Sequence, residues 1–318
     1  MSRLAALLLA ALAVAFPLSL LAGRVWINPF DPHLANAGLI LGELRLPRAA
    51  LSVIVGAGLG MAGAAMQGYL RNPLADPGLF GIAPAAALGA VLSLVLGLTS
   101  PSALPVFALA GAAGAMALLG LVAGRQGSVL LFTLAGMMIA SLAGALMSLA
   151  ISLSPTPFAM SEIVTWLMGA LADRSWREVW IAAPLTAAGM ACLVATGRDL
   201  DALILGGTTA RSLGMEPRRL QLLVVAGVGL TVGASVAVAG VIGFVGLMVP
   251  HFVRPFTDRR PSSLLLPSAL AGALLLLVAD SLCRIAPGPA ELRLGIALSL
   301  LGAPFFLQLL LRLRRKLA

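Results

Sequence analysis

The sequence predicts an all-α polytopic membrane protein in which ten helices span the membrane and both termini lie on the cytoplasmic side. Hydrophobic residues make up 60% of the chain and charged residues only 10%, whereas soluble domains carry roughly 25% charged residues. Apolar blocks of about 18 or more residues recur along the whole chain, and each is long enough to cross a bilayer core of about 30 Å. The blocks do not alternate with a period of two, which argues against a transmembrane β-barrel.

The first apolar block, Leu4–Ala22, follows Arg3 and is expected to be the first span. A signal peptide is the alternative, but the block is long for the hydrophobic region of such a peptide and no clear Ala-x-Ala cleavage site follows. The later blocks share the length and composition of membrane spans: Ala49–Leu70, Leu79–Leu98, Ala103–Ala123, Ser128–Leu153, Val179–Ala195, Leu222–Val249, Leu264–Ile285 and Leu292–Leu311. Between Ser154 and Glu178 a half-apolar segment with two tryptophans is expected to be a short interfacial helix.

The block Leu222–Val249 is too long for a single span at 1.5 Å per residue. Gly240 and Gly243 interrupt it, so we divide it into one full span and a shorter, broken span that runs to about Pro255. This division makes ten spans. Of the 21 basic residues, fourteen then lie on the inner side, as the positive-inside rule requires, and seven on the outer side: Arg24, Arg45, Arg48, Arg174, Arg177, Arg284 and Arg293.

One long polar stretch, Arg198–Gln221, separates spans six and seven of what we expect to be a single transmembrane domain, residues 1–318. Leu200–Leu213 can form a short amphipathic helix that ends at Gly214, and Pro217 can start a second segment. We interpret the stretch as a cytoplasmic docking surface. A weak internal match, Val55–Gly63 with Val232–Gly240, indicates an inverted repeat of the kind common in transporters. Chance is the alternative in a chain so rich in alanine and glycine.

Several classes of function are disfavoured. The only lysine is Lys316, so a Gly-Lys-Ser/Thr nucleotide-binding loop is impossible here, and ATP-driven transport would need a partner that binds ATP. The basic residues form no single patch for nucleic acid, and the two cysteines show no metal spacing. Ionisable residues are rare inside the spans, with Asp280 and Arg284 one helical turn apart. A proton-coupled secondary transporter, which depends on such residues, is therefore a second hypothesis, and a structural or receptor subunit is a third.

Two further segments have distinctive local sequences. Arg71–Gly78 contains two prolines and a glycine and joins two spans on the inner side, where it predicts either a plain turn or a constriction of a pore. Ile242–His251 is interpreted as the broken helix.

Five motifs occur together: LRLPR (44–48), RNPLADPGLFG (71–81), ARSLG (210–214), GFVGLMVPHFVR (243–254) and AELRLGIALSLLGAPFF (290–306). By their order and spacing the chain resembles the FecCD family, the permeases of type II ABC importers for cobalamin, haem and iron–siderophores. The resemblance covers nearly the whole chain and is specific to the family, but not to a substrate.

The resemblance implies partners and a set of sites. The family permease is a homodimer, or a pair of related permeases, in the membrane lipid; two ABC ATPase subunits bind ATP and Mg²⁺ below it, and a periplasmic substrate-binding protein docks above it. The chain itself binds no cofactor and no metal. The ATPase-coupling residues implied by the resemblance are Thr208, Thr209, Ala210, Arg211, Ser212, Leu213 and Gly214. Those for binding-protein docking are Arg45, Arg48 and Arg284, with snorkelling of arginines at the interface as the alternative.

The resemblance also implies two gates. Asn72 and Leu74 match the cytoplasmic gate, and the span Ser128–Leu153 resembles the helix that lines the pathway. Ser154 and Thr156 are candidates for the outer end, where Pro155 replaces a gate hydroxyl. The predicted function is that of a permease subunit of a bacterial inner-membrane ABC importer for an iron chelate, either a siderophore or haem, with cobalamin as the nearest alternative. No catalytic residues are expected.

Overall fold

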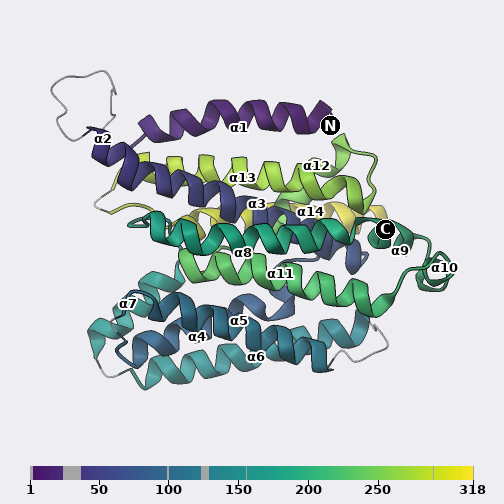
Figure 1. The fold of residues 1–318 in the computed structure, drawn as a ribbon, viewed down its shortest axis with the longest axis horizontal. Helices are drawn as coiled ribbons and strands as arrows, with labels where there is room; N and C mark the ends of the chain where they lie inside the picture. Colours follow the sequence, from purple (N-terminus) through teal and green to yellow (C-terminus); the bar gives the residue numbers. More distant parts are fainter. Residues whose placement is uncertain are drawn as a thin grey trace.

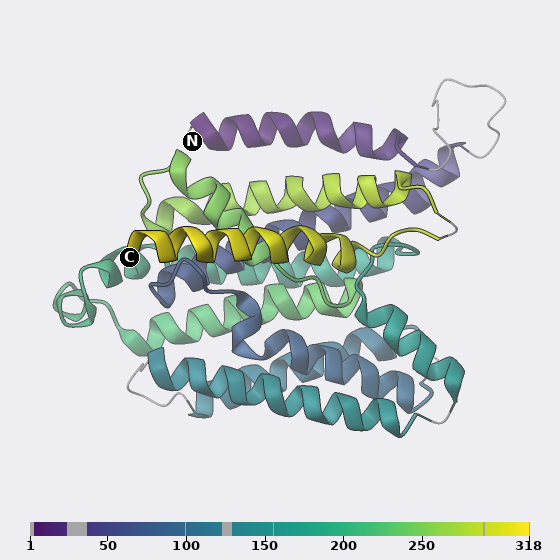
Figure 2. The same ribbon diagram turned by 180° about the vertical axis from the view of Figure 1, so that it is seen from behind.

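The long helices run side by side along a common direction, as opposite views of the molecule show (Figures 1 and 2). The computed structural model describes residues 3–23, 37–98, 100–122, 129–154, 156–288 and 290–317. The regular secondary structure within these ranges is entirely helical. Eight of the described helices are long and apolar enough to cross a membrane. These properties confirm the all-α polytopic architecture.

The long helices are α1 (Arg3–Leu21), α3 (Leu46–Tyr69), α5 (Ala103–Val122), α6 (Val129–Ser152), α8 (Trp176–Ala195), α11 (Pro217–Ala239), α13 (Pro261–Ile285) and α14 (Leu294–Leu317). A short helix α2 (Ala37–Leu39) and a π-helical turn η1 (Ile40–Arg45) extend α3 at its start. The remaining helices are shorter: α4 (Ile82–Val95), α7 (Pro157–Leu167), α9 (Gly197–Ile204), α10 (Gly207–Ser212), α12 (Val245–Val253), and the 3₁₀ turns η2 (Pro77–Phe80) and η3 (Arg254–Phe256).

The division of Leu222–Val249 is confirmed, because α11 ends at Ala239 and α12 begins at Val245. The break contains two residues with positive φ, Gly240 at 73° and Phe244 at 67°. The third span is shorter than predicted, since η2 takes up the beginning of the block and α4 starts only at Ile82. The predicted first residue of the fifth span, Ser128, lies outside the described residues.

The polar stretch differs from the prediction. The prediction of a single amphipathic helix at Leu200–Leu213 is wrong, because the chain forms two separate short helices there, α9 and α10. Gly206 lies between them with φ of 99°, a backbone conformation that side-chain-bearing residues rarely adopt. The predicted end at Gly214 and the second segment from Pro217 are confirmed.

Two helices form the centre of the bundle. The apolar windows of α3 and α11 are each 78% buried inside the protein, whereas that of α1 is 11% buried. α3 packs against α13, α8, α12 and α11. A Cβ atom on Gly56 of α3 would overlap the carbonyl oxygen of Gly272 in α13, so the absence of side chains there is what allows these two backbones to approach closely. The two segments of the weak internal match lie in α3 and α11; their inverted relationship stays a prediction.

Both ends of the described chain lie at the same end of the bundle as α9 and α10, while α2 and α7 lie at the opposite end (Figure 1). A chain that crosses the membrane an even number of times has both termini on the same side, which agrees with this arrangement. The number of ten crossings stays a prediction, because α4 and α12 are shorter than a full span. We call the end with α9 and α10 the inner end and the other the outer end, following the distribution of basic residues.

Candidate gate, coupling and docking sites

The predicted inner gate is a turn held by its own side chains. Asn72 donates its backbone N–H to the carbonyl of Gln67 at 3.1 Å, and its side-chain Oδ1 accepts from the N–H of Leu74 at 2.9 Å. Arg71 has a φ of 50°, which an arginine adopts only where its surroundings require it. Asn72 is exposed and Leu74 is half-buried. The turn therefore presents both predicted gate residues on a fixed backbone.

Asp76 and Phe80 anchor the second half of this turn. Asp76 Oδ1 accepts from the N–H of Gly78 at 2.8 Å and caps η2. Burial raises the pKa of Asp76 above its ordinary value, although the hydrogen bond from Gly78 acts against this shift. The Phe80 ring is fully buried and meets the ring of Phe132 in α6 edge to face, with centroids 4.3 Å apart. The gate turn is thus attached to the helix expected to line the pathway.

The gate turn also touches the helix break between α11 and α12. A Cβ atom on Gly246 would lie 2.6 Å from Cδ of Pro77, so the Pro77 ring lies directly against the backbone of Gly246. A cavity of about 190 Å³ lies beside this contact, and Asp76, Gly243 and Phe244 are among the residues that line it. This contact joins the predicted gate to the segment where the helix is interrupted between α11 and α12.

The predicted coupling residues form an exposed tip at the inner end. In α10, Thr208, Thr209, Arg211 and Ser212 are exposed, and the Leu213 side chain is 64% exposed, whereas Ala210 is fully buried. Arg211 Nε donates to the carbonyl of Gly207 at 3.1 Å, and Ser212 Oγ donates to that of Thr208 at 3.2 Å. Gly214 ends the tip with a φ of 92°. An exposed leucine beside an exposed arginine is suited to contact a partner.

An acidic side chain of the helix before this tip forms hydrogen bonds to the bundle. Asp201 of α9 accepts two hydrogen bonds from Ser262, one from its backbone N–H at 2.9 Å and one from its hydroxyl at 2.5 Å. Ser262 lies in the first turn of α13, where backbone N–H groups have no partner within the helix. Asp201 therefore caps α13 from a neighbouring element. Sequence patterns did not predict this cap, because its two partners are 61 positions apart.

At the outer end, two of the predicted docking arginines belong to a buried ionic cluster. Arg48 donates from Nε and Nη2 to the carboxylate of Asp280 at 2.9–3.1 Å. Its Nη1 lies 2.9 Å from Glu291 Oε2. Arg284 Nε lies 3.3 Å from Asp280 Oδ2, which confirms the predicted pair one helical turn apart. Side-chain exposure is 12% for Arg48, 5% for Arg284 and 1% for Asp280.

The same arginines hold the end of α1. Arg45 Nη1 donates to the carbonyls of Leu20 and Leu21 at 2.7 and 2.8 Å. Arg284 Nη2 donates to the carbonyl of Ser19 at 3.0 Å. The last carbonyls of a helix have no hydrogen-bond partner within it, so these arginines donate to carbonyl groups that would otherwise lack one. Arg45, which is half-buried, is the more accessible of the predicted docking residues; the docking role of all three stays a prediction.

The candidates for the outer gate have a local structural role. Thr156 begins α7, and its Oγ1 accepts from the N–H of Ala159 at 3.2 Å. Ser154 Oγ donates to the carbonyl of Thr156 at 3.5 Å. Pro155 between them lies outside the described residues. Thr156 is exposed and Ser154 is half-buried, so this short turn brings both hydroxyl groups to the end of α6.

The chain is similar to known proteins in both sequence and structure. The model of the FecCD transport family matches residues 11–312. The vitamin B12 import system permease protein BtuC of Salmonella paratyphi A is 39% identical over 303 residues, which cover 94% of this chain and 91% of that protein. The protein of the same name from Escherichia coli is 39% identical over 307 residues, covering 95% and 93%. A solved structure described as an inward-facing conformation of a putative metal-chelate type ABC transporter matches with a TM-score of 0.89 and 31% identity, covering 98% of this chain and 99% of that one. Among the described residues no group of three or more His, Cys, Asp or Glu could hold a metal ion.

Proposed function

The chain belongs to the FecCD transport family and is a multi-pass permease of the bacterial inner membrane, and we propose that it forms the pathway of an ATP-driven importer for cobalamin. The observation that carries the choice of cargo is the identity of 39% with vitamin B12 import permeases over 94% of the chain. This reverses the order that the sequence favoured, in which an iron chelate came first. The match extends from end to end, so the pathway and both docking faces are included in it.

An iron chelate, either a siderophore or haem, is the second candidate. The similar solved structure is described as a metal-chelate type transporter, and each of these cargoes is a metal chelate. Pro155, Val129 and Leu130 stand where the resemblance leads us to expect hydroxyl groups. A pathway wall with fewer polar groups makes fewer specific hydrogen bonds to its cargo.

The energy source is proposed to be ATP hydrolysis on two partner subunits, which bind ATP and Mg²⁺. The sequence contains no nucleotide-binding loop, since Lys316 is its only lysine. The exposed α10 tip, with Arg211 and Leu213, is the surface we assign to those subunits. The contact of α9 with α13 through Asp201 and Ser262 would transmit movement of the tip into the bundle.

A second copy of the permease and a periplasmic binding protein complete the proposed assembly. α6 exposes a row of large apolar side chains at helical spacing, Leu134, Met138, Leu142 and Leu149, and a second copy facing it would enclose a pathway. On the outer end, Arg45 is proposed to meet acidic groups of the binding protein. Charged contacts at such a rim mainly set orientation and association rate.

Reconstitution tests this proposal. The permease is co-purified with its ATPase subunit and placed in proteoliposomes with the cognate binding protein and internal ATP. We expect uptake of cobalamin that requires ATP and is not reduced by an excess of ferric siderophore or haem. Uptake of an iron chelate without cobalamin uptake would replace the first cargo by the second. Uptake driven by a proton gradient without ATP would reject the ABC mechanism.

A further inference from the structure

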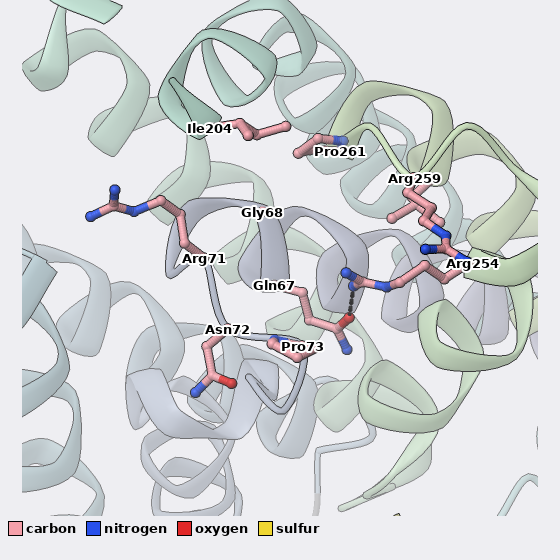
Figure 3. Close-up of a pocket in the computed structure, with 10 residues that line it drawn as sticks. Gln67, Gly68, Arg71, Asn72, Pro73, Ile204, Arg254, Arg259 and Pro261 are labelled. Atoms are coloured by element: carbon pink, nitrogen blue, oxygen red, sulfur yellow. Dashed lines mark hydrogen bonds between the residues drawn. The ribbon is translucent and has the colours of Figure 1, made fainter. Parts of the chain in front are cut away.

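A cavity of about 320 Å³ opens at the inner end, between the ends of several helices (Figure 3). Its lining comes from the end of α3, the gate turn, α9, the segment after α12 and the start of α13. Three arginines belong to it: Arg71, Arg254 and Arg259. In Figure 3, Arg254 and Arg259 lie on one side and Arg71 on the other, with its guanidinium directed away from them. We call this the arginine cavity.

Acidic side chains do not balance these charges. None of the three arginines has an ion-pair partner within 4.0 Å among the described residues. Two acids close in sequence to the cavity wall hydrogen-bond to other groups. Asp258 accepts from Ser263 Oγ and from the N–H of Arg260, and Asp201 accepts from Ser262. The described residues that line the cavity therefore include three arginines and no carboxylate.

Arg254 gives the clearest indication that the cavity binds a group that accepts hydrogen bonds. Its Nη2 donates to Gln67 Oε1 at 2.6 Å (Figure 3), but its Nε is buried and has no hydrogen-bond partner in the described part of the chain. A buried donor without an acceptor destabilises a protein, and a bound anion would supply the acceptor.

The backbone on two sides of the cavity is strained. Arg71 has a φ of 50° and Arg259 a φ of 64°, and such conformations persist where the surrounding structure enforces them, often at binding sites. Each of these conformations fixes where an arginine leaves the main chain. The sequence alone does not bring these residues together, because Arg71 and Arg259 are far apart in the chain.

From these observations we propose that the arginine cavity binds a phosphate group, supplied either by the headgroup of an anionic phospholipid or by a soluble phosphate compound. Guanidinium groups match the oxygen geometry of phosphate and donate to it in pairs. Basic pockets between membrane helices on the cytoplasmic side are suited to anionic headgroups. Phe252 and Phe256, two positions before and after Arg254 in the sequence, are 51% and 72% exposed and add apolar surface at this end of the bundle. The inference does not depend on which cargo is transported.

The test uses the full-length permease purified in detergent. The cavity variant is Arg259→Asn combined with Arg254→Gln; asparagine tolerates the positive φ at position 259 better than most residues. The control is Arg218→Gln with Arg219→Gln, which removes two exposed charges at the same end, outside the cavity. If the double variant does not fold, the single variant Arg259→Asn takes its place as the cavity variant, because Arg259 is exposed.

One arm measures, by native mass spectrometry, the phosphatidylglycerol retained from vesicles that also contain phosphatidylethanolamine. The other measures the shift in melting temperature caused by inorganic phosphate in lipid-free detergent, against chloride at equal ionic strength. We expect retention of phosphatidylglycerol to fall roughly tenfold or more in the cavity variant and to stay unchanged in the control. A phosphate-dependent shift that the variant loses, without preferential lipid retention, assigns the site to a soluble phosphate.

Equal lipid retention and equal phosphate response in wild type and cavity variant would overturn the proposal. It is also overturned if the variant loses only its binding to the ATPase subunit, because the arginines would then belong to a protein interface.

Discussion

The carboxylate of Asp201 in α9 holds the first turn of α13 through both the N–H and the hydroxyl of Ser262. The far end of α13 carries Asp280 and Arg284, which join Arg48 and Glu291 in the outer cluster. One continuous helix of 25 residues thus connects the element before the coupling tip with the outer rim. A rigid helix with specific contacts at both ends is a physical route by which a movement at one end reaches the other.

Removal of the cap should weaken this connection. We expect Asp201→Ala and Ser262→Ala each to lower the free energy of unfolding by about 1 kcal/mol, and the double variant to lose less than the sum because the two groups share one interaction. The measurement is a double-mutant cycle by denaturant titration in micelles. Strict additivity would show that the hydrogen bond from the Ser262 hydroxyl to Asp201 contributes nothing to stability. In the reconstituted importer, the number of cargo molecules transported per ATP should also fall.

The coupling tip should be required for ATP-driven transport but not for folding. Arg211→Glu with Leu213→Ala is expected to abolish uptake, since both side chains are exposed and available to a partner. Melting temperature should be unchanged for the same reason. Arg3→Gln, which removes an exposed charge at the same end of the bundle but outside the polar stretch, serves as the control and should leave uptake largely intact. Normal uptake in the tip variant would reject the assignment of this surface.

Asp280 should be among the residues most important for stability. Asp280→Asn leaves the Arg48 and Arg284 guanidinium groups buried without their main counter-charge, and breaking a buried pair in this way costs about 3–5 kcal/mol. Glu291→Gln removes a partner that is 33% exposed and should cost about 1 kcal/mol or less. Unfolding titrations of both variants test the ranking; equal losses would contradict it.

Charge reversal at Arg45 should weaken docking of the binding protein. Arg45→Glu is expected to slow association several-fold at low salt, with a smaller effect at high salt because screening weakens exposed charges. Surface plasmon resonance with the permease in nanodiscs gives both rates. Arg45 also holds the end of α1, so the melting temperature of the variant must be compared with that of wild type. An unchanged association rate at low salt would assign Arg45 to structure alone.

Protonation of Asp76 should stabilise the gate turn. Because burial raises the pKa of Asp76, the folded protein takes up this proton at a higher pH than the unfolded chain does. Stability therefore rises as the pH falls through the folded pKa, and the gain is complete below the unfolded value of about 3.9. Asp76→Asn keeps an oxygen that accepts from Gly78 but removes the charge. We expect this variant to melt no lower than wild type at pH 7 and to lose this pH dependence; a pH profile identical to that of wild type would contradict the role of Asp76.

The sequence by itself determined the class of protein and the course of its helices. The length and apolar character of the blocks predicted the spans, and Gly240 and Gly243 predicted the break that separates α11 from α12. These properties are local, since a bilayer requires about 20 apolar residues in succession wherever they occur. The motifs likewise identified the family, and the family model matches residues 11–312.

Only the tertiary structure decided which distant side chains meet. Arg48 and Asp280, which are 232 positions apart, form a buried ion pair. The sequence alone had indicated that Arg48 faces outward as a docking charge. The cap between Asp201 and Ser262 and the arginine cavity arise in the same way. The interruption of the polar stretch at Gly206 was also missed, because glycine permits a break without requiring one. Hydrophobic patterning places a helix in the membrane, but the packing of glycine-rich helices determines its rotation and neighbours, and these bring the polar groups together.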